Sequence, residues 1–388
     1  MPISTANFYT INHSHHPVKT IGIFGGGQLG LMLAEAALPL GIRCVFLEDT
    51  PNPPARLLGE VYSTEQFADF ASACDVFTLE FENTPLKSAK LLEESHTLFP
   101  PSNALGIAQD RLNEKNLFNQ LDIKTVPFLK VESQADILQA VKMLGLPLVL
   151  KTSRGGYDGK GQFVLKTAEK IGVAWAELGE ATKTAPLIAE GFINFVREVS
   201  IIAVRSQTGD IRYYPLVQNE HHHGILAKTT APAPNVAHLT EQAQSNIKKL
   251  LEHLDYVGVL TLELFVTEQH GGEHLLANEI APRVHNSGHW SIEGAVCSQF
   301  ENHMRAVAGL ALGDTSIISP CVMLNVIGQY PSLAKVLMVN GVHYHGYDKQ
   351  ERDDRKIAHI TVMPANSNQL DDAVKQVVAL LPNNMGLA

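Results

Sequence analysis

Two glutamates on a predicted β-hairpin constrain the fold of this chain more than any other feature. Residues 257–266 and 274–280 are predicted strands that carry Glu263 and Glu279, and the polar segment between them contains the turn. Because positions 263 and 279 are symmetric about residue 271, the hairpin is expected to place the two carboxylates opposite each other on one face. Directly opposed side chains have Cβ atoms about 5 Å apart, where like charges repel.

A divalent cation between the two carboxylates would remove this repulsion. Oxygen ligands favour Mg²⁺, with Mn²⁺ as the alternative, and Mg²⁺ usually combines one or two protein carboxylates with phosphate oxygens and water. The hairpin therefore predicts a metal site of Glu263 and Glu279. Two exposed glutamates on an ordinary hairpin remain the other explanation.

The segment directly after the hairpin concentrates functional groups in one turn. Residues 281–290 bring together the guanidinium of Arg283, the imidazoles of His285 and His289, an amide and a hydroxyl. The functional interpretation is a substrate site next to the hairpin, and the alternative is a polar surface loop.

Composition and charge exclude several classes of protein. The 388 residues are enough for two or three domains, and 45% hydrophobic with 18% charged residues is typical of a globular protein. A net charge of −10 predicts no nucleic-acid partner, so an anionic substrate would need a local basic pocket. No apolar run reaches the roughly 18 residues of a membrane span, and the start of the chain does not resemble a secretory signal. Four cysteines without a C-x-x-C pair argue against disulfides and favour the cytoplasm.

Residues 20–48 predict a βαβ unit with a glycine-rich first turn. A strand at 20–24 precedes Gly-Gly-Gly-Gln-Leu-Gly at 25–30, and a helix leads to a strand at 43–47 that ends at Glu48. Such glycines followed by an acid at the second strand are typical of nicotinamide dehydrogenases, the first rival class. The same glycines also serve any strand-to-helix turn that offers N–H groups to a phosphate.

A second glycine-rich loop, residues 152–162, lies between predicted strands at 147–151 and 163–165. Its N–H groups and Lys160 suit a flap that folds over phosphates. The loop is not a Walker motif, because Arg154 and Gly161 stand where that motif needs Gly and Ser or Thr. A flexible hairpin tip is the alternative.

Other segments give less specific predictions. Residues 80–83 follow a strand end, where they either line a ligand site or form a solvated acidic loop. The three histidines at 221–223 are expected in a loop, with one of them functional. One helical stretch is expected to start at Ser102 and to include Lys115, and another helix is expected from Trp290 to about Leu310.

Together and in this order, the motifs resemble those of the ATP-grasp ligases. The runs at 155–162 and 278–290, the turn at 25–30 and Tyr-Asp-Lys at 347–349 are similar to the N5-carboxyaminoimidazole ribonucleotide synthetases, the ATPase subunits of phosphoribosylaminoimidazole carboxylase. The resemblance covers nearly everything after residue 18 and leaves 1–18 as a disordered tail.

The resemblance implies an α/β (α+β) ATP-grasp fold in three parts. These are a Rossmann-like domain at 19–124, a small lid domain at 125–192, and a mixed-sheet ATP-grasp domain at 193–388 whose last part, about 313–388, is a small subdomain.

The resemblance also implies a reaction. ATP phosphorylates bicarbonate to carboxyphosphate, and this intermediate, or CO₂ released from it, carboxylates the exocyclic amine of 5-aminoimidazole ribonucleotide. The products are N5-carboxyaminoimidazole ribonucleotide, ADP and phosphate, in de novo purine biosynthesis. The implied assembly is a cytoplasmic homodimer with neither a nucleic-acid nor a membrane partner.

The implied roles attach to matching positions of this chain. The ATP-binding positions are Arg111, Lys151, Gly156, Tyr157, Asp158, Gly159, Lys160, Gly161, Gln162, Glu190, Gly191, Phe192, Ile193, Glu198, His221, Asn278 and Glu279. The positions around the ribonucleotide are Gln28, Leu29, Glu80, Tyr157, Asp158, Lys160, His285, Asn286, Ser287, Lys349 and Arg355. The catalytic residues are Arg283, which would face bicarbonate and carboxyphosphate, Lys349, Asp158 and His285, and the metal ligands are Glu263 and Glu279.

One position departs from the pattern of the superfamily. Many ATP-grasp ligases place Asn two residues after the second glutamate as a further metal ligand, and this chain has Ala281 there. A third protein ligand is therefore in doubt. Two other functions stay open: a formate-activating ATP-grasp enzyme, against which residues 285–290 argue, and a non-catalytic nucleotide sensor, against which Lys160 and the two glutamates argue.

Overall fold

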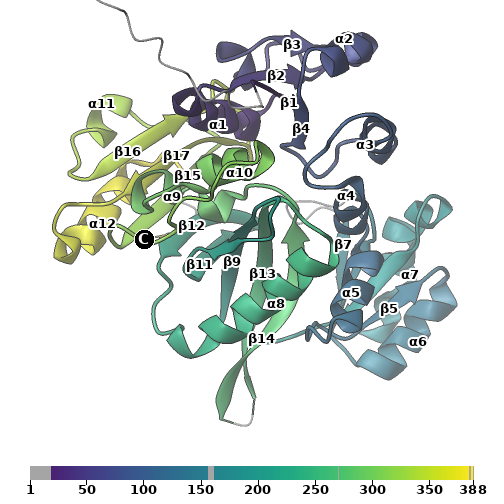
Figure 1. Cartoon of the computed structure of the whole chain (residues 1–388). Helices are drawn as coiled ribbons and strands as arrows, with labels where there is room; N and C mark the ends of the chain where they lie inside the picture. Colours follow the sequence, from purple (N-terminus) through teal and green to yellow (C-terminus); the bar gives the residue numbers. More distant parts are fainter. Residues whose placement is uncertain (1–18, 156–160, 270, 384–385, 388) are drawn as a thin grey trace, which may run out of the picture.

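The computed structural model describes residues 19–155, 161–269, 271–383 and 386–387 (Figure 1). The predicted tail at 1–18 lies outside the described residues. Within them, the strands form three sheets that follow one another along the chain. No helix in this part of the chain is long and apolar enough to cross a membrane.

The first sheet is parallel, has the strand order β3-β2-β1-β4 and begins with the predicted βαβ unit. Every residue of the central strand β1 is buried, because apolar side chains on both of its faces are covered. The elements of this part are β1 Thr20–Phe24, α1 Gln28–Ala37, β2 Arg43–Leu47, β3 Val61–Tyr62, α2 Phe67–Ser72, β4 Val76–Leu79 and α3 Leu86–Glu93.

The helical stretch expected from Ser102 onwards is two helices, α4 Ser102–Ala108 and α5 Arg111–Gln120. Asp110 separates them because its backbone is extended and its carboxylate accepts hydrogen bonds from the N–H groups of Leu112 and Asn113, 3.0 and 3.3 Å away. Because of this break, α5 is a separate helix, and it contacts the large sheet described below.

The small sheet is antiparallel, with the order β5-β8-β6-β7, and α6 and α7 pack over it (Figure 1). The loop of the predicted phosphate flap joins β6 to β7, and its residues 156–160 lie outside the described residues. The elements are β5 Phe128–Val131, α6 Gln134–Leu144, β6 Leu148–Thr152, β7 Gln162–Leu165, α7 Ile171–Leu178 and β8 Leu187–Gly191.

The large sheet has the order β14-β13-β9-β11-β12-β15-β17-β16, with β10 paired to β9. Alternate residues of β9 supply its two faces: Ile201 and Ala203 pack with α8, whereas Ile202 and Val204 pack with α10 and α1. The helix α10 thereby joins the first domain to the large sheet. The strands are β9 Arg197–Arg205, β10 Ile211–Tyr213, β11 Val217–His222, β12 Ile225–Ala231, β13 Gly258–Gln269, β14 Gly272–Ala281, β15 Cys321–Ile327, β16 Val342–Gly346 and β17 Lys356–Val362.

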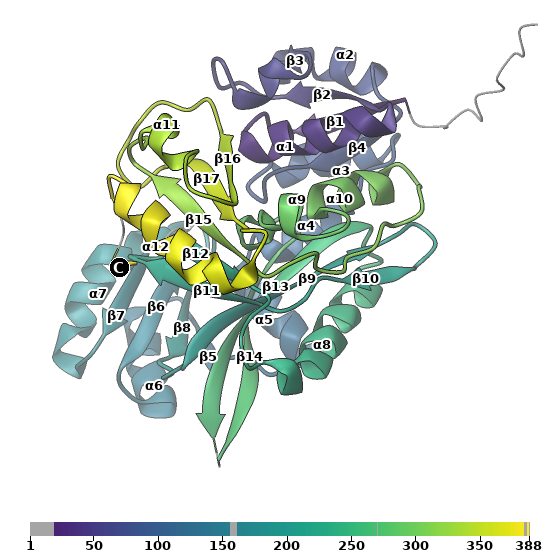
Figure 2. The same cartoon turned by 90° about the vertical axis from the view of Figure 1, so that its left-hand side faces the viewer.

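Two predictions made from the sequence are corrected in this region. His221 and His222 lie in strand β11 rather than in a loop, so neighbouring side chains point to opposite faces of the sheet. The helix expected from Trp290 to Leu310 is interrupted, because Ala295 forms a β-bridge with Ile317. The helices are α8 Thr240–His253, α9 Ser291–Gly294, α10 Gln299–Val307, α11 Leu333–Val336 and α12 Leu370–Leu380, the last of which packs on β15 and β17 (Figure 2).

Candidate active site

The hairpin of β13 and β14 pairs Glu263 directly with Glu279, as the sequence predicts. The strand register that produces this pairing is not a simple symmetric one. From Leu264 to Gln269 the strands pair so that position 263 would oppose Asn278, and a β-bulge between Glu263 and Leu264 shifts the register by one residue. The bulge therefore brings the second glutamate opposite the first.

Each of these carboxylates has a cationic or polar partner from outside the hairpin. Arg111 Nη1 lies 2.7 Å from Glu279 Oε2, and His285 Nε2 lies 3.0 Å from Glu263 Oε1. Burial raises the pKa of Glu263, but the hydrogen bond of His285 and the charges of His221 and Lys356 outweigh it and hold the pKa well below its usual value. Glu263 is therefore a carboxylate at neutral pH, the form that binds Mg²⁺.

The donor set fits a hard cation that takes most of its ligands from a nucleotide. Among the described residues, no group of three or more His, Cys, Asp or Glu side chains could hold a metal by itself. Two opposed carboxylates match Mg²⁺, which leaves its other positions to phosphate oxygens and water. Ala281 is 7% exposed and has no ligand atom in its side chain, as expected from the sequence.

One face of α5 lies along the edge strand β14 and contacts it with charged side chains. Arg111 binds Glu279, and Glu114 Oε1 accepts a hydrogen bond from Ile280 N at 2.6 Å. Burial and the neighbouring Glu279 raise the pKa of Glu114 to about 8. Our sequence interpretation missed Glu114 and Lys115. Their signal was present, because charged residues at i, i+3 and i+4 of Arg111 alternate with buried apolar ones.

The lid strands carry a buried cluster of charges. Lys151 Nζ lies 2.5 Å from Glu190 Oε2, and Lys115 Nζ lies 3.3 Å from Glu190 Oε1. Burial raises the pKa of Glu190, but the two lysines lower it to about 2. Next to this cluster, the N–H groups of Gly191 and Phe192 donate to the carbonyls of Pro127 and Pro147, 2.9 and 3.3 Å away. Both N–H groups are therefore already hydrogen-bonded within the protein.

The remaining ATP positions are placed as follows. Glu198 Oε2 and His221 Nδ1 are 2.8 Å apart, on the neighbouring strands β9 and β11. Gly161 has a φ of +70° and its carbonyl accepts a hydrogen bond from Thr152 N at 2.9 Å, which closes the base of the flap. Ile193 is half-buried and Gln162 is exposed. The flap positions Gly156, Tyr157, Asp158, Gly159 and Lys160 lie outside the described residues.

The turn after the hairpin is held from several sides. Arg283 Nε donates to Glu82 Oε2 of the first domain. His285 Nδ1 accepts from Ser287 N at 3.3 Å, so the hydrogen of the ring lies on Nε2, which faces Glu263. Gln299, another residue that the sequence did not reveal, donates to His285 O at 2.7 Å and accepts from His285 N at 3.0 Å. These contacts fix the imidazole next to the hairpin that carries Glu263 and Glu279, the proposed metal hairpin.

Asn286 and Ser287 are both predicted to contact the ribonucleotide. In the structure, their side chains form hydrogen bonds with other residues of the protein. The amide of Asn286 forms a reciprocal pair with Asn325 of β15, with N···O distances of 3.1 and 2.7 Å. Ser287 is fully buried, and its hydroxyl lies 2.8 Å from His285 Nδ1. Their side chains support His285.

The glycine-rich turn of the first domain is occupied by carboxylates of the chain itself. Glu80 accepts hydrogen bonds from Gly27 N at 2.6 Å and from Gly30 N, and Glu48 accepts from Gly26 N at 3.1 Å. A side chain at Gly25, where φ is +101°, would collide with Glu80. The N–H groups of Gly26, Gly27 and Gly30, which a dinucleotide phosphate would need, are thus taken by carboxylates of the chain, which argues against the dehydrogenase alternative.

The C-terminal loop closes over the same turn. Lys349 Nζ donates to Gln28 Oε1, and Arg56 Nη2 lies 2.7 Å from Asp348 Oδ2. Leu29 is 8% exposed and packs in the core, so only its backbone can reach a substrate. Arg355 Nη1 donates to the carbonyl of Gln350 at 3.4 Å. Lys349 and Gln28, which the sequence predicted to share a substrate, are thus in contact.

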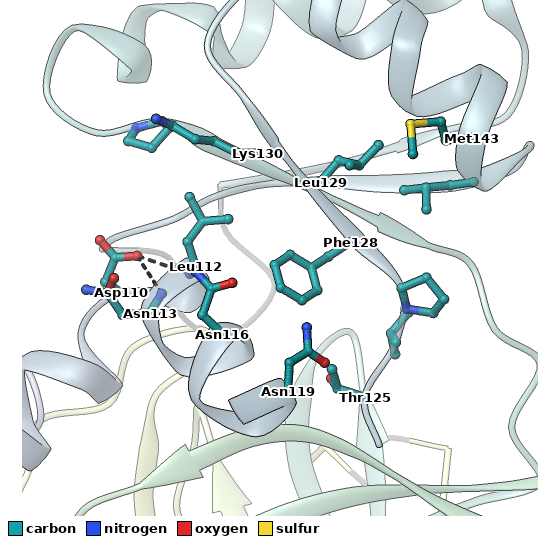
Figure 3. A pocket seen from close by; sticks show the side chains of 14 residues that line it. Asp110, Leu112, Asn113, Asn116, Asn119, Thr125, Phe128, Leu129, Lys130 and Met143 are labelled. Carbon is teal, nitrogen blue, oxygen red and sulfur yellow. Dashed lines mark hydrogen bonds between the residues drawn. The ribbon is translucent and has the colours of Figure 1, made fainter. Parts of the chain in front are cut away.

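A separate cavity of about 790 Å³ lies between α5 and the edge of the small sheet (Figure 3). Asn113, Asn116 and Asn119 of α5 line one side, and Phe128 and Met143 line the other. None of the residues predicted to bind ATP, metal or ribonucleotide lines it.

Comparisons with known proteins match three successive parts of the chain. A ribonucleotide synthetase preATP-grasp domain matches residues 18–109, an ATP-grasp domain 116–300, and a phosphoribosylaminoimidazole carboxylase C-terminal domain 321–373. The chain is 46% identical to the N5-carboxyaminoimidazole ribonucleotide synthase of Pseudomonas aeruginosa, over 93% of this chain and 99% of the relative.

Solved structures agree with these matches. The N5-carboxyaminoimidazole ribonucleotide synthetase of Thermus thermophilus is 44% identical, with a TM-score of 0.87 over 93% of this chain and 98% of that one. The N5-carboxyaminoimidazole synthase of Aspergillus clavatus, solved with ADP and 5-aminoimidazole ribonucleotide, is 29% identical, with a TM-score of 0.85 over 95% and 99% of the two chains.

Proposed function

The chain belongs to the N5-carboxyaminoimidazole ribonucleotide synthase family of ATP-grasp enzymes, and we propose that it carboxylates 5-aminoimidazole ribonucleotide with bicarbonate and ATP, through carboxyphosphate. The family, the ATP-grasp fold class and the function in purine biosynthesis that the sequence led us to expect are confirmed. The individual steps and the residues that perform them are the subject of the proposal.

The position of Arg283 carries the proposal. Its guanidinium binds Glu82 of the first domain, and the charges of Glu263 on the metal hairpin and of Glu80 also act on it. Burial lowers the pKa of Arg283, but these three carboxylates raise it, so the side chain stays charged. A permanently charged guanidinium between the metal hairpin and the first domain suits bicarbonate. This anion receives the γ-phosphoryl group of ATP, and its carboxyl group is then transferred to an amine.

Each group then has a defined task. Glu263 and Glu279 would hold Mg²⁺, which supplies charge neutralisation at the phosphates as the γ-phosphoryl group moves. Lys151 would bind the ATP phosphates, with the flap above them. Arg283 would orient bicarbonate and stabilise the negative charge that develops on carboxyphosphate. His285, whose Nε2–H points to Glu263, would keep that carboxylate in position.

The ribonucleotide would lie where the C-terminal loop meets the first domain. The chain is acidic overall, so a 5′-phosphate needs local cations, and Lys349 and Arg355 belong to the same loop. Lys349 already contacts Gln28 at the glycine-rich turn. We propose that these side chains bind the phosphate and ribose of the ribonucleotide.

The pKa of Lys349 gives a pH prediction for this assignment. Burial, followed by the charge of Arg355, lowers the pKa of Lys349 to about 8, against the opposing effect of Glu80. The ammonium form, present below this pKa, binds a phosphate, so kcat/KM for the ribonucleotide should fall by about tenfold per pH unit at higher pH. In Lys349→Arg the guanidinium stays charged, so the alkaline limb should disappear even if the maximal rate falls. The same limb in both proteins would contradict the assignment.

A direct assay tests the proposed function. Phosphate release from ATP should require bicarbonate, and the addition of 5-aminoimidazole ribonucleotide should yield the carboxylated product in equal amount to phosphate. Formate in place of bicarbonate should support no turnover, which separates the proposal from the formate-activating alternative. Turnover with formate would contradict the proposed function. ATP hydrolysis that depends neither on bicarbonate nor on the ribonucleotide would also contradict it.

Domain limits, assembly and location also remain proposals. The division at residues 124 and 192 follows the three sheets, and the homodimer can be tested by light scattering. All four cysteines are free thiols, which supports a reducing compartment such as the cytoplasm.

A further inference from the structure

Lys115 is a buried lysine to which the proposed mechanism gives no task. It is 2% exposed, on the face of α5 that lies against strand β14. Its Nζ donates hydrogen bonds to Asn278 O at 2.8 Å, Thr125 Oγ1 at 3.0 Å and Ala277 O at 3.4 Å, and it lies 3.3 Å from Glu190 Oε1. A buried ammonium is stable only when it is paired and hydrogen-bonded; the three acceptors match its three hydrogens, and Glu190 supplies the opposite charge.

The contacts of Lys115 join the two strands between which ATP is proposed to bind. Asn278 precedes the metal ligand Glu279 on β14, and Glu190 stands near the end of the lid strand β8. The ammonium therefore links the metal hairpin to the strand end that would hold the nucleotide base. Because its partners are a carboxylate and main-chain or hydroxyl oxygens, Lys115 sets the separation of the strands without contacting the nucleotide.

Glu190 is shared between two lysines that differ in mobility. Lys151 Nζ lies 2.5 Å from the second oxygen of Glu190, and its side chain is 19% exposed, whereas that of Lys115 is 2% exposed. If Lys151 turns from Glu190 towards a phosphate, Lys115 remains next to Glu190. The buried carboxylate therefore still has one cationic partner. Without Lys115, release of Lys151 would leave a buried carboxylate without a cationic partner at close range, which is strongly unfavourable.

We propose that Lys115 is a positioning residue of the ATP site: it is the fixed counter-ion of Glu190 that leaves Lys151 available to the phosphates of the nucleotide. This inference rests on the proposed function for the identity of the nucleotide, but its test uses ADP binding alone. Lys115 acts through Glu190 and Lys151 and touches no reacting atom.

The test measures Mg-ADP affinity by calorimetry in Lys115→Met, which removes the charge but keeps the length of the side chain. Lys151 should then be held by Glu190, and ADP affinity should fall about ten- to a hundredfold, the range for one lost charge-assisted contact. The double variant Lys115→Met/Glu190→Gln removes the carboxylate that holds Lys151, so it should recover most of the lost affinity. KM for the ribonucleotide should be unchanged in both variants.

Matched controls separate positioning from a general loss of structure. Lys142→Met, on the exposed face of the lid helix α6, should bind ADP like the unmodified protein, and circular dichroism should show that all variants are folded. Unchanged ADP affinity in Lys115→Met, or a double variant no better than the single one, would overturn the inference. If the unmodified protein bound ADP but did not carboxylate the ribonucleotide, the proposed function would fail and the role of Lys115 would still be decided.

Discussion

Glu279→Gln is expected to lower turnover by about three orders of magnitude, because a metal ligand supplies several kcal/mol at the transferring phosphoryl group and each 1.4 kcal/mol is tenfold in rate. The substitution keeps the shape of the side chain and removes its charge. The loss should be accompanied by weaker dependence on Mg²⁺, measured as the Mg²⁺ concentration for half-maximal phosphate release. Full activity in Glu279→Gln would disprove the metal assignment.

The structure supplies a control and changes one expectation for this variant. Glu268 lies on the same hairpin, five residues beyond Glu263, and is exposed, so Glu268→Gln should retain activity. The sequence alone suggests that removal of one of two repelling carboxylates could raise thermal stability. Because Arg111 lies 2.7 Å from Glu279, the substitution also leaves Arg111 with a weaker partner, and we expect no gain in the melting temperature.

Arg283→Met should abolish carboxylation and destabilise the protein at the same time. The guanidinium is proposed to stabilise carboxyphosphate, and it also neutralises Glu82, whose side chain is 26% exposed. Loss of one partner from a buried ion pair costs about 3–5 kcal/mol, and the partial exposure of Glu82 favours the lower end, about 3 kcal/mol. Denaturant unfolding and bicarbonate-dependent phosphate release would measure the two effects.

A second substitution separates the two roles of Arg283. In Glu82→Gln/Arg283→Met the unpaired carboxylate is gone, so stability should recover while carboxylation stays absent. Recovery of both would show that Arg283 only holds the first domain against the large sheet. Loss of both in the double variant would mean that the pair is required for the fold, and Arg283→Lys, which keeps the charge but not the fork, would then report on catalysis.

The sequence by itself determined the features that depend on local periodicity. Two strand-like segments, 257–266 and 274–280, with a polar glycine-bearing segment between them predicted the hairpin, and symmetry about residue 271 pointed to the Glu263–Glu279 pair, although the pairing itself depends on the β-bulge. The strand at 20–24, the glycine-rich turn and the helix that follows were predicted from a continuous apolar run and the spacing of the glycines. These elements could be predicted because the order of apolar, glycine and polar residues within a short segment determines its local conformation.

Only the tertiary structure decided which charges meet. Glu80 binds N–H groups of the glycine-rich turn from 50 residues away along the chain, which argues against a dinucleotide phosphate at this turn. Arg283 pairs with Glu82 across 201 residues, and Lys349 contacts Gln28 across 321. A local pattern carries no information about such partners, because they depend on which elements pack together after the chain has folded.

The edge strand β14 shows both kinds of information in one place. Its sequence gave the position of Glu279, but the β-bulge that sets its register and the side chains of α5 that bind it were not visible in the strand itself. Lys115 carried only the weak signal of its helical spacing. Its task follows from the packing of α5 between the lid and the large sheet, where a buried ammonium must find oxygen partners from both.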